Sequence, residues 1–290
     1  MDYMNYTGKV CLVTGASSGM GRATTEMLVT LGAEVYALDL NECKVEGIKK
    51  YVYCNLSKKE FIDEAFKQLP EHIDCFFGVA GLSGSKTDYI TTFHCDYTAN
   101  MYITTKYLQN RMGKGGGIVY VSSTAGLNWK KFMKEEKKIV HSRDWDEITK
   151  LITPLAKAAP SSFAYLYAKR CILYFACEQA VELGKLGIRV NSVLPGSTDT
   201  GMKDEFEKMA GGEEALLAET GTAHRLATSE EMAGPIVFLN SDICSFVSGV
   251  DFCVDSADYC LKTLKLKKDR ESISMTNKLI LKIAKKMMSK

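Results

Sequence analysis

Two tyrosines and a lysine lie within a span of five residues in the stretch SSFAYLYAKRC, residues 161–171. On a helix, residues four apart share a face, so Tyr165 and Lys169 would point to the same side, while Tyr167 is turned by about 200° from Tyr165. A phenol with a pKa of ~10 is a poor base near neutral pH, and a neighbouring ammonium group favours the phenolate. The spacing therefore predicts that Tyr165 is an acid/base group assisted by Lys169 and that Tyr167 is a packing residue.

The spacing alone does not select this pair, because Tyr102 and Lys106 in NMYITTKYL repeat it. Only Tyr165 follows a serine at the end of a strand-like run, which is GIVYVSS at residues 117–123. A serine hydroxyl beside the phenol would donate a hydrogen bond to an oxygen atom that Tyr165 protonates. We therefore assign the acid/base role to Tyr165 and not to Tyr102.

A glycine-rich turn, TGASSGMG at residues 14–21, lies between a strand-like run and a helical pattern. Gly15 permits the sharp turn, Gly19 lets the backbone approach a phosphate, and Gly21 allows the helix to pack closely on the strand. The N-terminus of that helix offers free N–H groups and a partial positive charge to a pyrophosphate. The turn predicts a dinucleotide site. The other residues of the turn that we expect at the cofactor are Ser17, Ser18 and Met20.

Asp39 ends the next strand-like run, eighteen residues after Gly21. A carboxylate at this position accepts hydrogen bonds from both hydroxyls of an adenosine ribose and repels a 2′-phosphate. Ser18 and Leu40, which would face such a phosphate, carry no positive charge. The sequence therefore favours NAD(H) over NADP(H).

Strand-like and helical patterns alternate along the chain. The strands are expected at residues 9–15, 34–40, 50–54, 73–81, 117–123, 187–196 and 250–255, and the helices at 20–32, 58–69, 92–112, 164–183 and 230–239. This alternation predicts an α/β fold with a parallel sheet covered by helices on both faces. Residues 127–163 interrupt this alternation of strands and helices. They contain both tryptophans and a charge cluster, which indicates a helical insertion.

Seven motifs in order resemble those of the short-chain dehydrogenase/reductase family, over about residues 9–255. They are the glycine turn, Asp39, VAG at 79–81, Asn100, VSSTAG at 121–126, YLYAK at 165–169 and PGSTDT at 195–200. The resemblance implies one doubly wound, Rossmann-type domain over residues 1–260, with a seven-stranded parallel sheet, followed by a separate tail at 261–290.

The resemblance also implies the roles of individual residues. Ser123, rather than Ser122, polarises the substrate oxygen, Tyr165 is the acid/base, Lys169 binds the nicotinamide ribose and Asn100 supports a proton relay. Ser122 is left to a local hydrogen bond. The further cofactor contacts that it implies are Asn55, Leu56, Ala80, Gly81, Pro195, Gly196, Thr198 and Thr200.

Several positions depart from the family pattern. Gly78 and Val79 replace the usual two asparagines, and Asn55 replaces an aspartate but can still hydrogen-bond an adenine amino group. The 41 residues between Ser123 and Tyr165, and the short segment after Asp39, resemble the branch that contains bacterial 3α-hydroxysteroid dehydrogenase/carbonyl reductase. That branch implies a secondary alcohol or ketone as substrate, with a 3α-hydroxysteroid or bile acid favoured.

The substrate contacts are expected from two segments that flank the reactive residues. Trp129 of the insertion, and Met202 and Phe206 after Thr200, offer apolar surface to a large ring system. The insertion's aromatic side chains would alternatively pack its own small core. A smaller non-steroid alcohol or carbonyl compound is the second hypothesis for the substrate. A non-catalytic dinucleotide-binding sensor is the third, although a sensor has no need of Ser123, Tyr165 and Lys169 together.

The cysteines and histidines of the chain bear on disulfide formation and metal binding. The ten cysteines include no CxxC pair, and the four histidines form no ligand pattern, so we expect reduced thiols and no metal.

Residues 261–290 carry a charge of +8 and leave −6 on the rest of the chain, which gives no reason to expect nucleic acid. The tail has the pattern of a basic amphipathic helix, which more often docks on protein than on a membrane. We expect a cytoplasmic homo-oligomer, a dimer or a tetramer.

Overall fold

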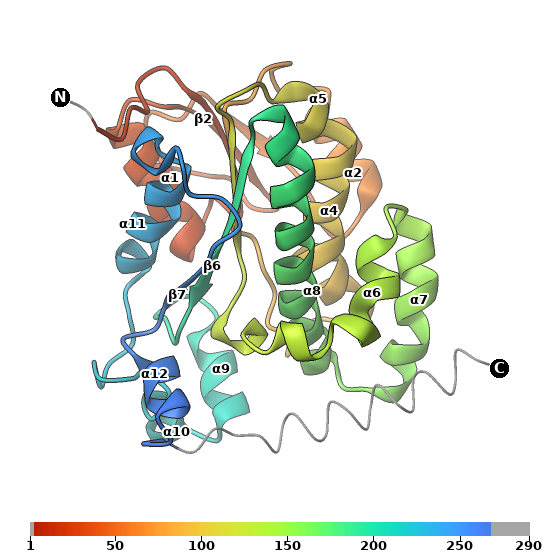
Figure 1. The fold of residues 1–290 in the computed structure, drawn as a ribbon, viewed down its shortest axis with the longest axis vertical. Helices are drawn as coiled ribbons and strands as arrows, with labels where there is room; N and C mark the ends of the chain where they lie inside the picture. Colours follow the sequence, from red (N-terminus) through yellow and green to blue (C-terminus); the bar gives the residue numbers. More distant parts are fainter. Residues whose placement is uncertain (1–2, 268–290) are drawn as a thin grey trace.

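A seven-stranded parallel sheet forms the centre of the structure, a computed structural model that describes residues 3–267 (Figure 1). Its strand order is β3-β2-β1-β4-β5-β6-β7, so the chain starts in the middle of the sheet and winds outward to each edge in turn. This confirms the predicted doubly wound α/β fold. The strands are β1 (Val10–Thr14), β2 (Glu34–Asp39), β3 (Lys50–Tyr53), β4 (Cys75–Gly78), β5 (Gly117–Val121), β6 (Arg189–Pro195) and β7 (Asp251–Val254).

The sheet is buried on both faces, which explains why its strands read as nearly continuous apolar runs. Successive residues point to opposite sides, so Leu12 belongs to one core and Val13 to the other. Helices α1 (Gly19–Thr30) and α11 (Ser229–Asn240) pack together over the Val13 face. The Leu12 face is covered by α2 (Lys59–Phe66), by α8 (Ser161–Glu182) and by the helical segment of residues 89–111.

The helical segment of residues 89–111 contains two π-helical turns. It runs through α3 (Tyr89–Phe93), a π turn (His94–Thr98), α4 (Ala99–Ile103), a second π turn (Thr104–Leu108) and α5 (Gln109–Arg111). It begins three residues before the predicted start, because the Asp88 side chain accepts a hydrogen bond from the Thr91 N–H and caps the first turn. π turns are often found at functional sites, and the first one here directly precedes Asn100.

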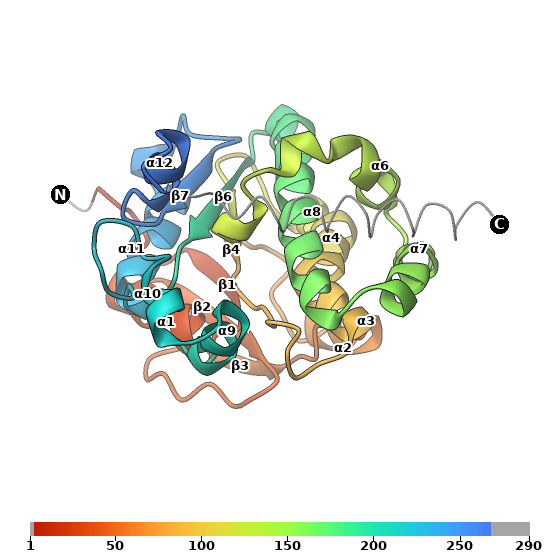
Figure 2. The ribbon, with the colours of Figure 1, turned by 90° about the horizontal axis from the view of Figure 1, so that it is seen from below.

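The predicted insertion is helical and lies outside α8 (Figures 1 and 2). A 3₁₀ turn (Thr124–Gly126) precedes it, and it contains a second one (Trp129–Lys131) followed by α6 (Met133–His141) and α7 (Trp145–Ala158). The Trp129 ring stacks on Tyr174 at 5.7 Å between ring centroids, and the Trp145 ring stacks on His94 at 4.5 Å. Both tryptophans therefore attach the insertion to the helices of the main fold.

A buried ion pair also joins the insertion to α8. Arg170 Nε on α8 lies 2.7 Å from Glu136 Oε1 on α6, and both side chains are at most 2% exposed. The Arg170 guanidinium also lies 4.0 Å from the centroid of the Phe132 ring. An arginine stays charged even when buried, and the ionised Glu136 carboxylate is the counter-charge that makes this burial tolerable. Burial raises the pKa of Glu136 to about 8, against the opposing effect of the Arg170 charge.

Three short helices gather at the end of the molecule where the strands finish. They are α9 (Lys203–Ala210), α10 (Glu213–Leu217) and α12 (Asp258–Thr263). The predicted amphipathic tail falls from residue 268 onward outside the described residues. Within residues 3–267, none of the helices has the length and apolar character that crossing a membrane requires.

The buried pair gives a first prediction. Glu136→Ala should lower the free energy of unfolding by about 3–5 kcal/mol, because Arg170 then stays buried without a counter-charge. The double variant Glu136→Leu with Arg170→Met should recover most of this loss, since it removes both charges. Urea unfolding above pH 8, where Glu136 is ionised, measures both changes.

The matched control is Glu26→Ala, which removes a carboxylate from an exposed pair with Arg22 at 2.8 Å. It should change the free energy of unfolding by less than about 1 kcal/mol. Similar losses in Glu136→Ala and Glu26→Ala would contradict the role given to the buried pair.

Candidate active site

The residues predicted to act on cofactor and substrate follow the ends of successive strands. Asp39 ends β2, Ala80 lies two residues after β4, Ser123 lies two residues after β5 and Pro195 ends β6. Because all strands are parallel, these ends meet at one edge of the sheet. In open parallel sheets, this carboxyl edge is where ligands bind.

The glycine turn is packed too tightly for side chains. Gly15 has a φ of +72°, and a Cβ there would lie 2.8 Å from Ala80 Cα. A Cβ on Gly21 would lie 1.9 Å from the Gly15 carbonyl oxygen. Ser18 begins α1 in an extended conformation without a side-chain cap, and the first turn carries no acid. The turn therefore fits an anionic pyrophosphate against the backbone N–H groups of α1.

Residues 195–200 cross from the end of β6 to this turn. The Gly196 N–H donates to the Val254 carbonyl oxygen at 2.9 Å, and the Thr198 hydroxyl donates to the Gly196 carbonyl oxygen at 3.0 Å. A Cβ on Gly19 would lie 3.5 Å from the Thr200 side chain. Thr200 and the glycine turn thus flank the same space, as the sequence predicted.

Asp39 faces the glycine turn. Its Oδ2 accepts a hydrogen bond from the Ser17 N–H at 3.0 Å, and its Oδ1 accepts one from the Asn41 N–H at 2.8 Å. Both oxygens keep a second lone pair, with which they can accept bonds from ribose hydroxyls. Leu40 beside it is exposed and carries no charge of its own.

Asn55 and Leu56, which were both predicted to contact the cofactor, lie in different environments. Asn55 Oδ1 accepts hydrogen bonds from both the N–H and the hydroxyl of Ser57, at 3.0 and 2.7 Å. The amide nitrogen of Asn55 is therefore the group that it can offer, and as a donor it suits an adenine ring nitrogen rather than the amino group that the sequence indicated. The Leu56 side chain is buried in the core, so it does not line the groove.

Tyr165 stands in the first turns of α8 and faces the end of β5. Its phenol lies near the Ser123 side chain, and its ring meets the Phe206 ring of α9 edge-on, with 5.5 Å between centroids. Burial raises the pKa of Tyr165 above its ordinary range; the Ser123 side chain lowers it and the charge of Asp96 raises it further. The structure thus brings Ser123, Tyr165 and Phe206 together, as predicted.

Lys169 lies one turn further along α8. Its Nζ lies 5.5 Å from the centroid of the Tyr165 ring, and donates to the Val121 carbonyl oxygen at 3.1 Å. The Ser122 hydroxyl donates to the Lys169 carbonyl oxygen at 2.7 Å, so its partner lies on α8 and is not the local group that the sequence predicted. The Lys169 ammonium therefore lies beneath the phenol, held from the end of β5.

Asn100 is buried beside this lysine. Its Nδ2 donates to the Asp96 carbonyl oxygen at 3.3 Å, and a Cβ on Gly78 would lie 2.4 Å from its Oδ1. Glycine at position 78, a departure from the family pattern, is thus needed to fit Asn100. Among the described residues no direct hydrogen bond joins Asn100 to Lys169, so the relay role stays a prediction.

The second YxxxK pair has a different environment. Lys106 donates to the Tyr102 hydroxyl at 2.6 Å, but both side chains bind Asp63 of α2 on the outer surface. Tyr167 is buried and packs on Phe93, with 5.6 Å between ring centroids. Tyr167 is thus a packing residue, and the acid/base role of Tyr165 stays a prediction.

One predicted substrate contact is wrong. Trp129 is 4% exposed, and its Nε1 donates to Asp251 Oδ2 at 2.9 Å. Its stacking partner Tyr174 lies nine residues beyond Tyr165 on α8, more than two helical turns away. Both tryptophans of the insertion pack against the main fold, so they neither line the substrate site nor form a core of the insertion's own. Met202, which precedes α9, is half-buried.

Known proteins share this arrangement over most of their length. A sequence model of short chain dehydrogenases matches residues 9–134, and one described as enoyl-(acyl carrier protein) reductase matches residues 150–256. Coniferyl-alcohol dehydrogenase from Pseudomonas sp. (strain HR199 / DSM 7063) is 31% identical over 255 residues, which cover 87% of this chain and 97% of that protein. The chain belongs to the short-chain dehydrogenase family.

Other members of the family are more distant. Dehydrogenase/reductase SDR family member 6 of Rattus norvegicus is 27% identical over 271 residues, covering 86% of this chain and 96% of that protein. The crystal structure of 3-alpha-hydroxysteroid dehydrogenase from Pseudomonas sp. B-0831, complexed with NADH, superposes with a TM-score of 0.70 at 20% identity, covering 90% of this chain and all of that one. Family membership and this NADH complex support a nicotinamide dinucleotide as cofactor.

Glu205 is a residue of the site that the sequence did not reveal. It lies on α9, next to Phe206, and accepts hydrogen bonds from the hydroxyls of Ser83 and Ser85 and from Lys86 Nζ, the last two at 2.6 and 2.7 Å. Burial alone would raise the pKa of Glu205, but these bonds lower it to about 2. The carboxylate thus holds α9 against the loop after β4, with Phe206 over Tyr165.

The contact of Glu205 with the loop of residues 83–86 predicts an effect on KM, because it holds α9 and Phe206 next to Tyr165. Glu205→Ala should raise KM for the alcohol by about tenfold, because α9 loses a charged anchor worth ~1.4 kcal/mol or more. NADH binding, measured by fluorescence titration, should stay unchanged. The carboxylate is charged at every pH well above 2, so the effect should be the same across pH 6–9.

Glu207→Ala is the matched control, since Glu207 lies on the same helix and, among the described residues, makes no contact with the loop of residues 83–86. An equal rise in KM for both variants would show that α9 is merely destabilised by the loss of a glutamate.

Proposed function

We propose that the protein is an NAD-dependent oxidoreductase that interconverts an alcohol and the corresponding carbonyl compound. The observation that carries this proposal is the contact of the Tyr165 phenol with Ser123, above the Lys169 ammonium and beside the glycine turn. An acid/base group, an oxygen-binding hydroxyl and a dinucleotide turn at one sheet edge match the needs of such a reaction.

The bound nicotinamide supplies the carbon that accepts or donates a hydride. In oxidation, the Tyr165 phenolate takes the proton of the substrate hydroxyl while the hydride leaves the carbinol carbon. Ser123 donates a hydrogen bond to the same oxygen and holds it at the phenol. In reduction, Tyr165 returns the proton to the carbonyl oxygen. Lys169 supplies positive charge that favours the phenolate form, and we assign its ammonium to the nicotinamide ribose.

The substrate is proposed to carry an apolar ring system next to the reacting carbon. Phe206 offers its ring to the space beside Tyr165. A 3α-hydroxysteroid or bile acid is our first candidate, supported by the likeness to the hydroxysteroid dehydrogenase structure. An aromatic alcohol is the second, supported by the coniferyl-alcohol dehydrogenase relative, since aromatic rings stack readily on a phenylalanine.

A spectrophotometric screen of NADH formation distinguishes these candidates. It would include 3-, 7-, 12- and 17-hydroxysteroids, coniferyl alcohol and simple secondary alcohols. Turnover of hydroxysteroids alone would support the first candidate, and turnover of coniferyl alcohol alone the second. NADH binding without turnover of any alcohol would instead support the non-catalytic sensor.

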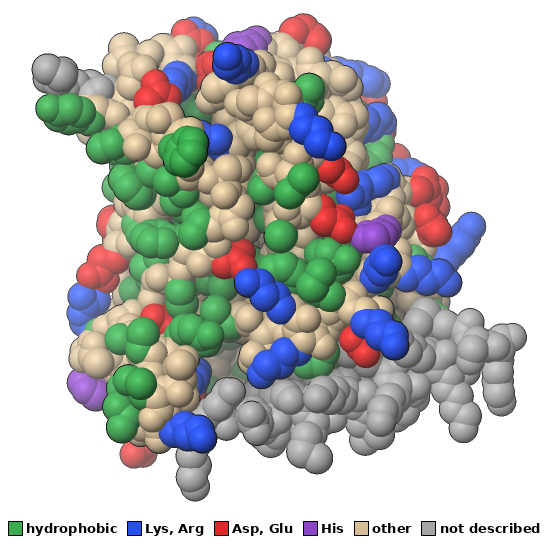
Figure 3. All heavy atoms as spheres, viewed as in Figure 1, with side chains coloured by type: hydrophobic (Ala, Val, Ile, Leu, Met, Phe, Trp, Pro, Cys, Tyr) green, Lys and Arg blue, Asp and Glu red, His purple; other side chains and the backbone are tan. Residues whose placement is uncertain are grey.

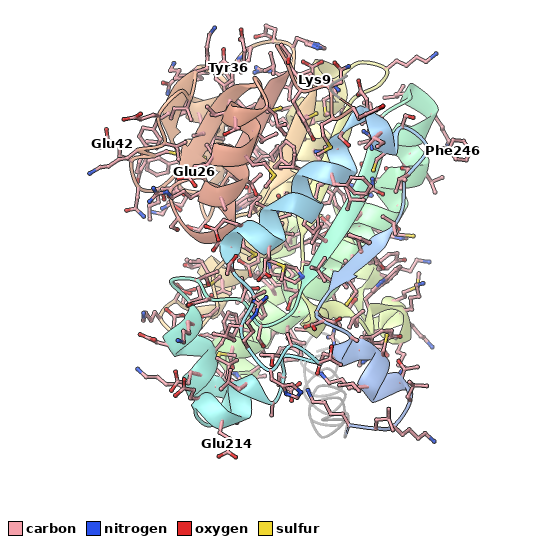
Figure 4. All side chains as sticks on the ribbon, turned by 90° about the vertical axis from the view of Figure 1, so that its left-hand side faces the viewer. Lys9, Glu26, Tyr36, Glu42, Glu214 and Phe246 are labelled. Carbon is pink, nitrogen blue, oxygen red and sulfur yellow. The ribbon has the colours of Figure 1, made fainter. Side chains whose placement is uncertain are left out.

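We also propose that the oligomer is formed through the α11 and β7 side of the molecule. Helix α6 covers part of α8 on the other side. Exposed apolar side chains here include Phe238, Ile243, Phe246 and Phe252. Figure 3 shows hydrophobic side chains gathered where Figure 1 places α11 and β7, and Phe246 projects from the surface in Figure 4. An apolar surface of this kind supports contact with a second copy.

The mechanism predicts the effect of removing the phenol. Tyr165→Phe should keep NADH binding but lower kcat by about 100- to 10,000-fold, because no group then transfers the proton. Fluorescence titration and the alcohol assay measure the two quantities. Tyr102→Phe, which removes the phenol of the other YxxxK pair, should leave kcat within about twofold of wild type. Unchanged turnover in Tyr165→Phe would overturn the assignment.

The position of Asp39 predicts cofactor preference. The wild-type protein should prefer NAD to NADP by on the order of 100-fold in kcat/KM, because the carboxylate repels a 2′-phosphate. Asp39→Asn keeps an oxygen for the Ser17 N–H but loses the charge, and should reduce this preference by about tenfold or more. Comparable kcat/KM values for the two cofactors in wild type would remove the role of Asp39.

A further inference from the structure

A buried carboxylate lies behind the catalytic lysine. Asp96 occupies the π turn before α4, and its side chain is 0% exposed. Its Oδ1 accepts a hydrogen bond from the Leu82 N–H at 2.7 Å. Its Oδ2 lies 3.8 Å from Lys169 Nζ and has no hydrogen-bond partner among the described residues. Neither the motifs of the sequence nor the mechanism above uses this residue.

Lys169 is the charge that makes this burial tolerable. A buried carboxylate is costly unless an opposite charge or several donors face it, and Leu82 supplies only one donor. Burial raises the pKa of Asp96 to about 6, against the opposing effects of the Lys169 charge and the Leu82 N–H. Above that pH, the site therefore contains a carboxylate and an ammonium that compensate each other.

The surrounding backbone is shaped for this pair. A Cβ on Gly81 would lie 3.3 Å from Lys169 Nζ and 3.6 Å from Asp96 Oδ1, so the missing side chain leaves the two groups room. Asp96 also lies four residues before Asn100, and the Asn100 amide donates to its carbonyl oxygen. The loop after β4, the π turn and α8 thus meet at this one carboxylate.

We propose that Asp96 is a positioning residue that holds the Lys169 ammonium in place and limits the positive charge that Lys169 presents to Tyr165. The proposal rests on the alcohol oxidoreductase function proposed above and extends it to the control of its proton transfer. No bond is made or broken at Asp96, which acts through Lys169.

The direction in which Asp96 shifts the pKa of Tyr165 follows from the charges around the phenol. The negative charge of Asp96 raises the pKa of Tyr165, whereas a positive charge at Lys169 favours the phenolate. The titratable groups that face Asp96 within residues 3–267 are Lys169 and Tyr165 of α8 and Cys95 beside it. Removing the Asp96 charge should therefore allow the Tyr165 phenolate to form at lower pH.

The test is the pH profile of kcat/KM for oxidation of the alcohol that gives the highest rate in the screen. Asp96→Asn keeps the shape of the side chain and an oxygen for the Leu82 N–H. It should move the acid limb of the profile to lower pH by about one unit. Asp96→Ser, which is also neutral and can also accept from Leu82, should move it in the same direction and serves if the asparagine variant does not fold.

Asp63→Asn is the matched control. Asp63 binds the Tyr102 and Lys106 pair on the outer surface, so this variant makes the same chemical change beside the other YxxxK pair. Its acid limb should coincide with that of wild type. A limb that does not move in the neutral Asp96 variants, or that moves equally in Asp63→Asn, would overturn the proposal.

A titration without substrate separates this proposal from the proposed function. Tyrosinate absorbance of the NAD-bound protein, with the Tyr165→Phe protein subtracted, reports the ionisation of Tyr165 alone. It should occur at lower pH in Asp96→Asn than in wild type, even if none of the screened alcohols is turned over. An unchanged titration would overturn the role of Asp96, whereas a shifted titration without turnover would overturn only the oxidoreductase function.

Discussion

The Ser122 hydroxyl donates to the Lys169 carbonyl oxygen, and this 2.7 Å hydrogen bond joins the end of β5 to α8. The two side chains proposed to act on the substrate, Ser123 and Tyr165, come from different elements, so their relative position depends on how these elements are held together. Gly126 permits this close approach, because a Cβ there would lie 2.7 Å from the same carbonyl oxygen. With β5 and α8 fixed in this way, Ser123 reaches Tyr165 and the Lys169 ammonium reaches the Val121 carbonyl oxygen.

The sequence predicted most of the fold, because a parallel sheet buried on both faces leaves a strong signal of apolar runs alternating with helices. It also predicted the positions that depend on local chain geometry, such as the Gly15 turn and Asp39 at a strand end. Those positions are fixed within one βαβ unit, and the glycine turn and the acid occur there at recognisable spacing.

What the sequence could not predict are contacts between segments far apart in the chain. Glu205 meets Ser83 across 122 residues, and no spacing rule connects them. Trp129 was misplaced for the same reason, since its Asp251 partner lies 122 residues away. Asp96 left one usable signal, because an acid four residues before Asn100 shares a face of the same helix. The importance of its charge depends on the 3.8 Å between Asp96 Oδ2 and Lys169 Nζ of α8, a contact that the sequence does not show.

The buried pair of Arg170 and Glu136 has a consequence for how this chain can be altered. Arg170 follows Lys169 directly on α8, so the insertion supplies the counter-charge for a residue next to the proposed site. Deleting α6 to obtain a smaller protein would leave a guanidinium buried without a counter-charge on the helix that also bears Tyr165. Loop grafting between relatives should therefore treat residues 133–141 and position 170 as one transferable unit.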